Sequence, residues 1–148
     1  MAATLQEILL APDTQPKVLD DCYSLIQQEV SDLSGVSGAA IKLGYKTVAA
    51  FMPNHIRYLL EQMLPGLVDE LQPYWEDFHA AGGSDFGDYL TKRGDEVSQS
   101  LLTVTDRRAE RSDRPTIIKA YRSVRGSAGK HIQAALPRLG ELVSKYAA

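Results

Sequence analysis

The chain has 148 residues, of which 44% are hydrophobic and 24% charged, and its net charge is −3. This length and composition suit one globular domain with its own core, and they exclude a disordered chain, a collagen-like repeat and a disulfide scaffold. The single cysteine, Cys22, excludes an internal disulfide and a zinc site built from two or four cysteines. We therefore expect residues 1–148 to form a single domain.

Apolar residues recur with the 3.6-residue period of an α-helix along nearly the whole chain, and no convincing strand pattern appears. In chain order, the pattern predicts a short helix in the first ten residues and longer helices over about 15–33, 37–52, 56–78, 86–104 and 117–146. Pro53 should stop the helix over 37–52. Pro65 and Pro73 make the next segment either one bent helix or two abutting ones, and Pro137 should bend the last. The prediction is an all-α, single-domain bundle of five or six amphipathic helices, some of them bent at prolines.

The first ten residues lack the basic start and the unbroken apolar core of a secretory signal. No stretch approaches the 18 consecutive apolar residues of a membrane span. We therefore expect a cytoplasmic protein without a membrane span.

Charge is distributed unevenly along the chain. Residues 1–104 hold 6 Lys/Arg and 15 Asp/Glu, net −9, whereas residues 105–148 hold 10 and 4, net +6. The densest basic cluster consists of Arg107, Arg108, Arg111 and Arg114, with acidic residues between them. The favoured interpretation is a solvated cluster paired within the fold, and the alternative is a surface for a partner or an anion. No aromatic residue lies among the arginines to stack on a base, so no nucleic-acid partner is expected.

No complete catalytic or metal-binding set stands out. Glu76 and His79 have the spacing of a ligand pair in di-iron helical bundles, but such sites need this motif twice. Cys22 lies on an apolar stripe, which favours a buried, unreactive thiol. We expect no cofactor and no metal. The sequence leaves enzymatic activity open and favours its absence.

Glycines and tyrosines within the predicted helices are the most informative small features. Gly44 and Gly94 interrupt otherwise good helices at a cost of about 1 kcal/mol each, which favours close contact between helices. Tyr45 and Tyr121 lie on apolar stripes, where a phenol needs a hydrogen-bond partner. The alternative for these four residues is a pocket for a small apolar ligand.

Several short segments resemble those of an uncharacterised bacterial family of small helical proteins of unknown function. They are Ser37-Gly38-Ala39-Ala40-Ile41-Lys42, Gly44-Tyr45-Lys46, Leu64-Pro65, Leu67-Val68-Asp69, Phe86, Tyr89-Leu90, Val104-Thr105-Asp106, Arg125-Gly126-Ser127-Ala128 and Leu136-Pro137. The resemblance covers most of the chain and implies one intact domain. It assigns no functional residue.

These observations favour a non-enzymatic interaction or assembly module that binds a protein, with a second copy of the chain as one such partner. The alternative is a helical domain that binds a small molecule or lipid in an interior lined by glycines and tyrosines.

Overall fold

The computed structural model describes residues 3–52 and 54–148, and within them it contains seven helices and no strand. The helices are α1 (Leu5–Leu9), α2 (Gln15–Asp32), α3 (Gly35–Phe51), α4 (His55–Ala80), α5 (Phe86–Lys92), α6 (Gly94–Glu110) and α7 (Pro115–Ala147). The all-α prediction is confirmed. The predicted number of helices is too low, because the segment expected as one helix over 86–104 is two.

The additional break lies at Arg93, which ends α5 and precedes α6. Its backbone angles, φ −111° and ψ 30°, are not those of an α-helix. Gly94 is therefore the first residue of α6 rather than a residue inside a longer helix. The buried residues of α5 and α6 keep a spacing of three or four residues across the break, as Leu90, Gly94 and Val97 show. Periodicity alone therefore could not reveal the break.

The helix ends follow local chemistry. The side chains of Thr4 and Asp85 accept hydrogen bonds from the backbone N–H groups of Glu7 and Asp88 at the starts of α1 and α5. Pro65 and Pro73 lie inside the continuous helix α4, so of the two alternatives the single helix is correct. Pro53, the predicted stop after α3, lies outside the described residues.

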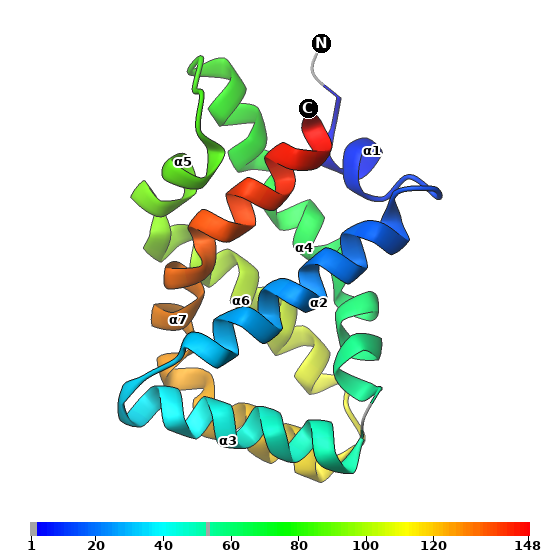
Figure 1. Cartoon of the computed structure of the whole chain (residues 1–148), viewed down its shortest axis with the longest axis vertical. Helices are drawn as coiled ribbons and strands as arrows, with labels where there is room; N and C mark the ends of the chain where they lie inside the picture. The colour runs from blue at the N-terminus through cyan, green and yellow to red at the C-terminus, as the bar shows by residue number, and fades with distance from the viewer. Residues whose placement is uncertain (1–2, 53) are drawn as a thin grey trace.

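Most of the contacts between helices involve the long helices α4 and α7 (Figure 1). Helices α5 and α6 pack on α7, α6 also packs on α4, and α2 contacts both α4 and α7. Helix α3 crosses one end of the molecule, while α1 lies at the other end beside the last turns of α7. Ser37 contacts His131 at 3.1 Å and Met52 contacts Arg114 at 3.3 Å, so α3 runs antiparallel along the first half of α7.

The core is concentrated away from α3. The main cluster of buried side chains draws on α1, α2 and α4 to α7, and no described residue of α3 belongs to it. The buried residues of α7 all fall within 136–143, in its second half. We call α3 together with residues 115–135 of α7 the α3 end. Val48 is buried there, whereas six other apolar side chains of this end are only half-buried: Ile41, Tyr45, Ile117, Ile118, Val124 and Ile132.

Two glycines bring α5 and α7 into backbone contact. A Cβ atom added to Gly140 would lie 2.1 Å from the Cα atom of Gly87, and one added to Gly87 would lie 3.0 Å from the carbonyl oxygen of Pro137. Close contact between helices was predicted for Gly44 and Gly94 instead. A Cβ on Gly44 meets nothing within 4 Å, and one on Gly94 meets the flexible side chain of Gln133.

Candidate functional site

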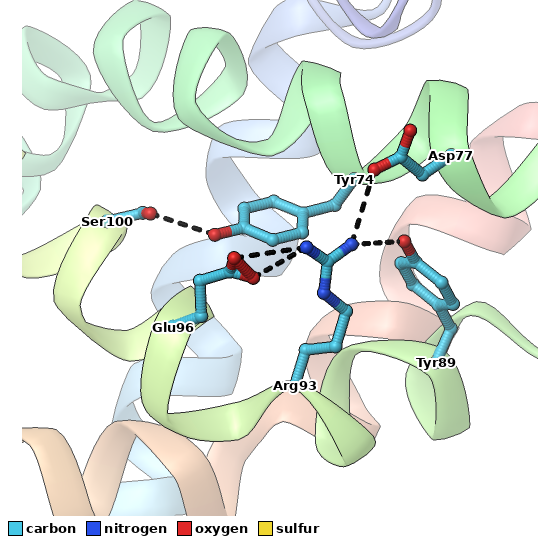
Figure 2. A network of polar contacts seen from close by, with 6 residues as sticks. All are labelled: Tyr74, Asp77, Tyr89, Arg93, Glu96 and Ser100. Atoms are coloured by element: carbon cyan, nitrogen blue, oxygen red, sulfur yellow. Dashed lines mark hydrogen bonds and ion pairs between the residues drawn. The ribbon is translucent and has the colours of Figure 1, made fainter.

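The most extensive polar network surrounds Arg93, at the break between α5 and α6 (Figure 2). One guanidinium nitrogen donates to Asp77 at 3.3 Å and to the hydroxyl of Tyr89 at 2.5 Å, and the other donates to both carboxylate oxygens of Glu96 at 3.0 and 2.6 Å. The guanidinium carbon also lies 4.9 Å from the ring centre of Tyr74.

This network is built to hold helices together. It joins α4 through Asp77 and Tyr74, α5 through Tyr89, and α6 through Glu96. The charged partners neutralise one another, because Arg93 forms ion pairs with both Asp77 and Glu96. We assign the Arg93 network a structural role: it fixes the angle between α5 and α6 where the helix breaks.

A second cluster joins α6 to α7. Arg125 donates to both oxygens of Asp106, at 2.8 and 3.1 Å, and the hydroxyl of Tyr121 also donates to Asp106. The Tyr121 hydroxyl lies 2.7 Å from that of Thr105. The predicted need of Tyr121 for a hydrogen-bond partner is therefore met. The hydrogen bonds from Arg125 and Tyr121 lower the pKa of Asp106 despite its partial burial.

The lowered pKa of Asp106 makes the stability of this cluster pH-dependent. Because the folded-state pKa lies below the unfolded value of about 3.9, the ionised carboxylate contributes stability above that value, and the contribution is lost as the pH falls through the folded-state pKa. We expect Asp106→Asn to lower the free energy of unfolding in urea at pH 7, and the difference from wild type to shrink below about pH 4. Asp69→Asn, at an exposed carboxylate without an ion pair, is the control. A pH-independent difference would contradict the prediction.

The four predicted surface arginines meet at one corner of the molecule, where α3 and α6 end and α4 and α7 begin. Within the described residues, none of them forms an ion pair with a carboxylate. The predicted pairing of the basic C-terminal third holds instead for Arg125, Arg138 and Lys145, which pair with Asp106, Glu29 with Asp32, and Asp21. We call the corner where the four arginines meet the arginine corner. Its residues are His55, Tyr58, Arg107, Arg108, Arg111 and Arg114.

Helix α3 presents an apolar face to solvent beside this corner. Val36, Leu43 and Phe51 are 92%, 69% and 77% exposed, and Leu43 is the middle residue of the helix. The hydroxyl of Thr47 donates to the carbonyl of Leu43 at 2.8 Å, so this face offers no unpaired hydroxyl. We call this surface the α3 face. At 100° per residue it comprises Val36, Ala39, Ala40, Leu43, Gly44, Thr47, Ala50 and Phe51.

The four residues predicted to line a pocket do not share one. Tyr45 lines a hollow of about 300 Å³ between α2 and α3, and its buried hydroxyl has no hydrogen-bond partner among the described residues. Tyr121 lines a hollow of about 480 Å³ between α6 and α7. Gly94 packs on Gln133 of α7, and Gly44 lies on the α3 face.

The candidate metal and thiol residues have ordinary surroundings. Within residues 3–52 and 54–148, no three His, Cys, Asp or Glu side chains gather in a way that could hold a metal ion. The ring of His79 packs edge-on against that of Trp75, with 4.2 Å between centres. Burial, with a smaller effect from Asp21, raises the pKa of Cys22 to about 11, which disfavours its reactive thiolate. No helix in the described part of the chain is both long and apolar enough to cross a membrane.

Comparison with known families finds a match over nearly the whole chain. The model of a family of unknown function (DUF6918) matches residues 5–147, from the first residue of α1 to the last of α7. The chain belongs to this family. The match confirms the resemblance to an uncharacterised family, and it places all seven helices of the described residues within the DUF6918 domain. No curated protein and no solved structure matches the chain.

Sequence reasoning found the arginine corner of this DUF6918 domain but missed the α3 face. The apolar stripe read from the sequence, with Ile41, Tyr45 and Val48, is the side that faces the other helices. The signal was present, because Val36, Leu43 and Phe51 make α3 apolar on the opposite side as well. A helix with apolar residues on two opposite sides is expected to be covered on both, and in the single chain α3 is covered on only one.

Proposed function

We propose that the chain is a non-enzymatic assembly module that forms a homodimer through the α3 face. The observation that carries this proposal is the exposure of Val36, Leu43 and Phe51 on one side of a helix that is otherwise packed. Exposed apolar patches of this kind mark interaction sites on soluble domains.

The α3 face is complementary to itself when two copies pack antiparallel about Leu43. In that register Val36 of one copy lies level with Ala50 of the other, and Phe51 lies level with Gly35. Large side chains thus meet small ones at the two ends of the contact, while the two Leu43 side chains meet each other at its centre. A two-fold axis through Leu43 gives the isologous contact that is typical of homodimers.

The size and charge of the contact predict its strength. An interface confined to one pair of helices lies at the small end of specific contacts, below about 1,200 Å² in total, so we expect a reversible dimer. Lys42 and Lys46 are the only charged residues of α3, and the arginine corner adjoins its end. These cations repel each other across the two copies. Added salt should therefore tighten the dimer, because about 1 M salt shortens the screening length from about 10 to about 3 Å relative to 0.1 M.

Sedimentation velocity over a wide range of protein concentration tests this proposal. We expect wild type to show a reversible monomer–dimer equilibrium and Leu43→Glu to remain monomeric, because two buried carboxylates would face each other at the two-fold axis. Gln99→Glu is the matched control, since it adds the same charge at an exposed position of α6 and should dimerise like wild type. In the antiparallel register, Val36→Cys in one copy should crosslink to Ala50→Cys in another.

Three results would contradict the proposed dimer. A wild-type chain that stays monomeric at about 1 mM would refute the proposal. So would a Leu43→Glu dimer of wild-type strength, or a dimer that weakens as salt is added, since each would move the contact away from the apolar α3 face.

A further inference from the structure

The arginine corner contains a pocket that no residue of the α3 face lines. It has a volume of about 340 Å³, within the range of small-molecule sites. The side chains that line it come from the start of α4, the end of α6 and the turn between α6 and α7. They are His55, Tyr58, Arg108, Arg111, Ser112, Asp113 and Arg114.

The electrostatics of this pocket favour an anion. Arg108, Arg111 and Arg114 line it, against a single carboxylate from Asp113, and none of these four side chains forms an ion pair within the described residues. Helices α4 and α7 both begin at the pocket without a side-chain cap, so the positive ends of their dipoles add positive potential there, although Pro115 at the start of α7 has no N–H to donate. The end of α6 opposes this in part.

His55 supplies an independent observation. It lines the pocket, yet its Nε2 atom is out of contact with solvent and has no hydrogen-bond partner among the described residues. An unpaired buried polar atom is costly, and such atoms in native structures call for an explanation. Because Nε2 is out of contact with solvent, a ligand oxygen in the pocket becomes its partner only if the ring of His55 turns toward the pocket.

The ionisation of His55 is coupled to the same surroundings. Burial and the charges of Arg114 and Arg108 lower its pKa, so the ring is neutral near pH 7. The groups facing the pocket are Tyr58 from α4, Arg108 and Arg111 from α6, and Asp113 and Arg114 from the turn. An anion bound among them would offset the arginine charges and raise the pKa of His55, so its binding should be accompanied by proton uptake.

We infer that this pocket binds a phosphomonoester group, held by Arg108, Arg111 and Arg114. A phosphoryl dianion matches three guanidinium groups, each able to donate two parallel hydrogen bonds to its oxygens. The pocket volume exceeds that of a bare phosphate ion, which favours a phosphate carried on a small organic group. Serine residues in a phosphorylated protein and small phosphorylated metabolites share this chemistry. The inference does not depend on dimer formation.

Isothermal titration calorimetry at constant ionic strength tests the site with glycerol phosphate, a phosphoserine peptide and inorganic phosphate. We expect saturable binding of at least one phosphomonoester with a dissociation constant of about 1 mM or tighter. Tighter binding of glycerol phosphate would indicate a small phosphorylated metabolite as the natural ligand, and tighter binding of the peptide would indicate a phosphorylated protein. Inorganic phosphate should bind more weakly than the tighter of these two. The double substitution Arg111→Gln with Arg114→Gln should weaken binding at least about tenfold, because each guanidinium contributes charged hydrogen bonds.

A charge-matched control distinguishes binding in this pocket from general electrostatic attraction of anions to the protein surface. Lys119→Gln with Lys130→Gln removes the same charge from exposed positions of α7 that do not line the pocket, and should leave the affinity unchanged. The His55 resonance should also titrate at higher pH when ligand is bound. Absence of saturable binding by every phosphomonoester, or equal loss in both double variants, would overturn the inference. Leu43→Glu should bind as wild type does, so failure of the dimer and failure of this site are distinguishable.

Discussion

Alanine in place of Phe86 should lower the free energy of unfolding by about 3–5 kcal/mol. The Phe86 side chain is 1% exposed, and its ring packs against those of Trp75, Phe78 and Tyr89, with centres 5.0, 5.1 and 6.3 Å away. Removing the ring loses this burial and leaves a cavity between α4 and α5, where close packing prevents full collapse. Urea unfolding followed by circular dichroism measures the loss.

Phe51→Ala is the matched control for Phe86→Ala. The same atoms are removed, but the Phe51 side chain is 77% exposed on the α3 face. In the monomer we expect a change within about 0.5 kcal/mol, as for most surface substitutions. Similar losses at the two positions would show that the core does not lie where the structure places it.

Gly140→Ala should cost about 3 kcal/mol, which corresponds to a fall in melting temperature of about 6–12 °C for a chain of this length. The added methyl group would lie 2.1 and 2.3 Å from the Cα and N atoms of Gly87. These are backbone atoms of α5, so the clash cannot be relieved by turning a side chain. Helices α5 and α7 would have to move apart, and they share the most extensive contact between helices in the described residues.

The control for Gly140→Ala lies on the same helix. A Cβ on Gly126 meets nothing within 4 Å, so Gly126→Ala should stabilise the chain by up to about 1 kcal/mol through helix propensity alone. Thermal melts of the two variants should therefore shift in opposite directions. A Gly140→Ala variant that melts at or above wild type would rule out the tight backbone contact.

The fold could be predicted where local chemistry decides it. Helical periodicity and capping residues place most helix ends within a few residues of the structure. The break at Arg93 could not be predicted, since it depends on Asp77 and Tyr74 of α4, which lie far away in the sequence. A Cβ at Gly94 would lie 2.9 Å from the Gln133 side chain of α7, in line with the predicted helix contact, but the tightest contact between backbones is at Gly140. Gly140 lies on the apolar stripe four residues after Leu136, so the same reasoning applied to α7 would have found it.

The candidate sites were predictable to different degrees. The four arginines stand out in the sequence, but their freedom from ion pairs depends on tertiary structure, because the carboxylate of Asp106 pairs with Arg125 rather than with its neighbours. His55 carried no sequence signal, since only the packing of α4 against the α6–α7 turn brings it to the pocket. The α3 face could be read from the sequence, because α3 carries large apolar residues in addition to those of its buried stripe.

The uneven core implies that the two ends of the molecule open at different rates. Amide hydrogens whose exchange requires the main cluster to unfold, such as those in α6 and the second half of α7, report the global stability. Those of α3 and residues 115–135 are protected mostly by half-buried side chains, with the buried Val48 as an exception, so they should exchange through a smaller, separate opening. The DUF6918 domain then consists of a rigid body and a looser end. An assembly that covers the looser end would gain part of its specificity from ordering it, at a cost in affinity.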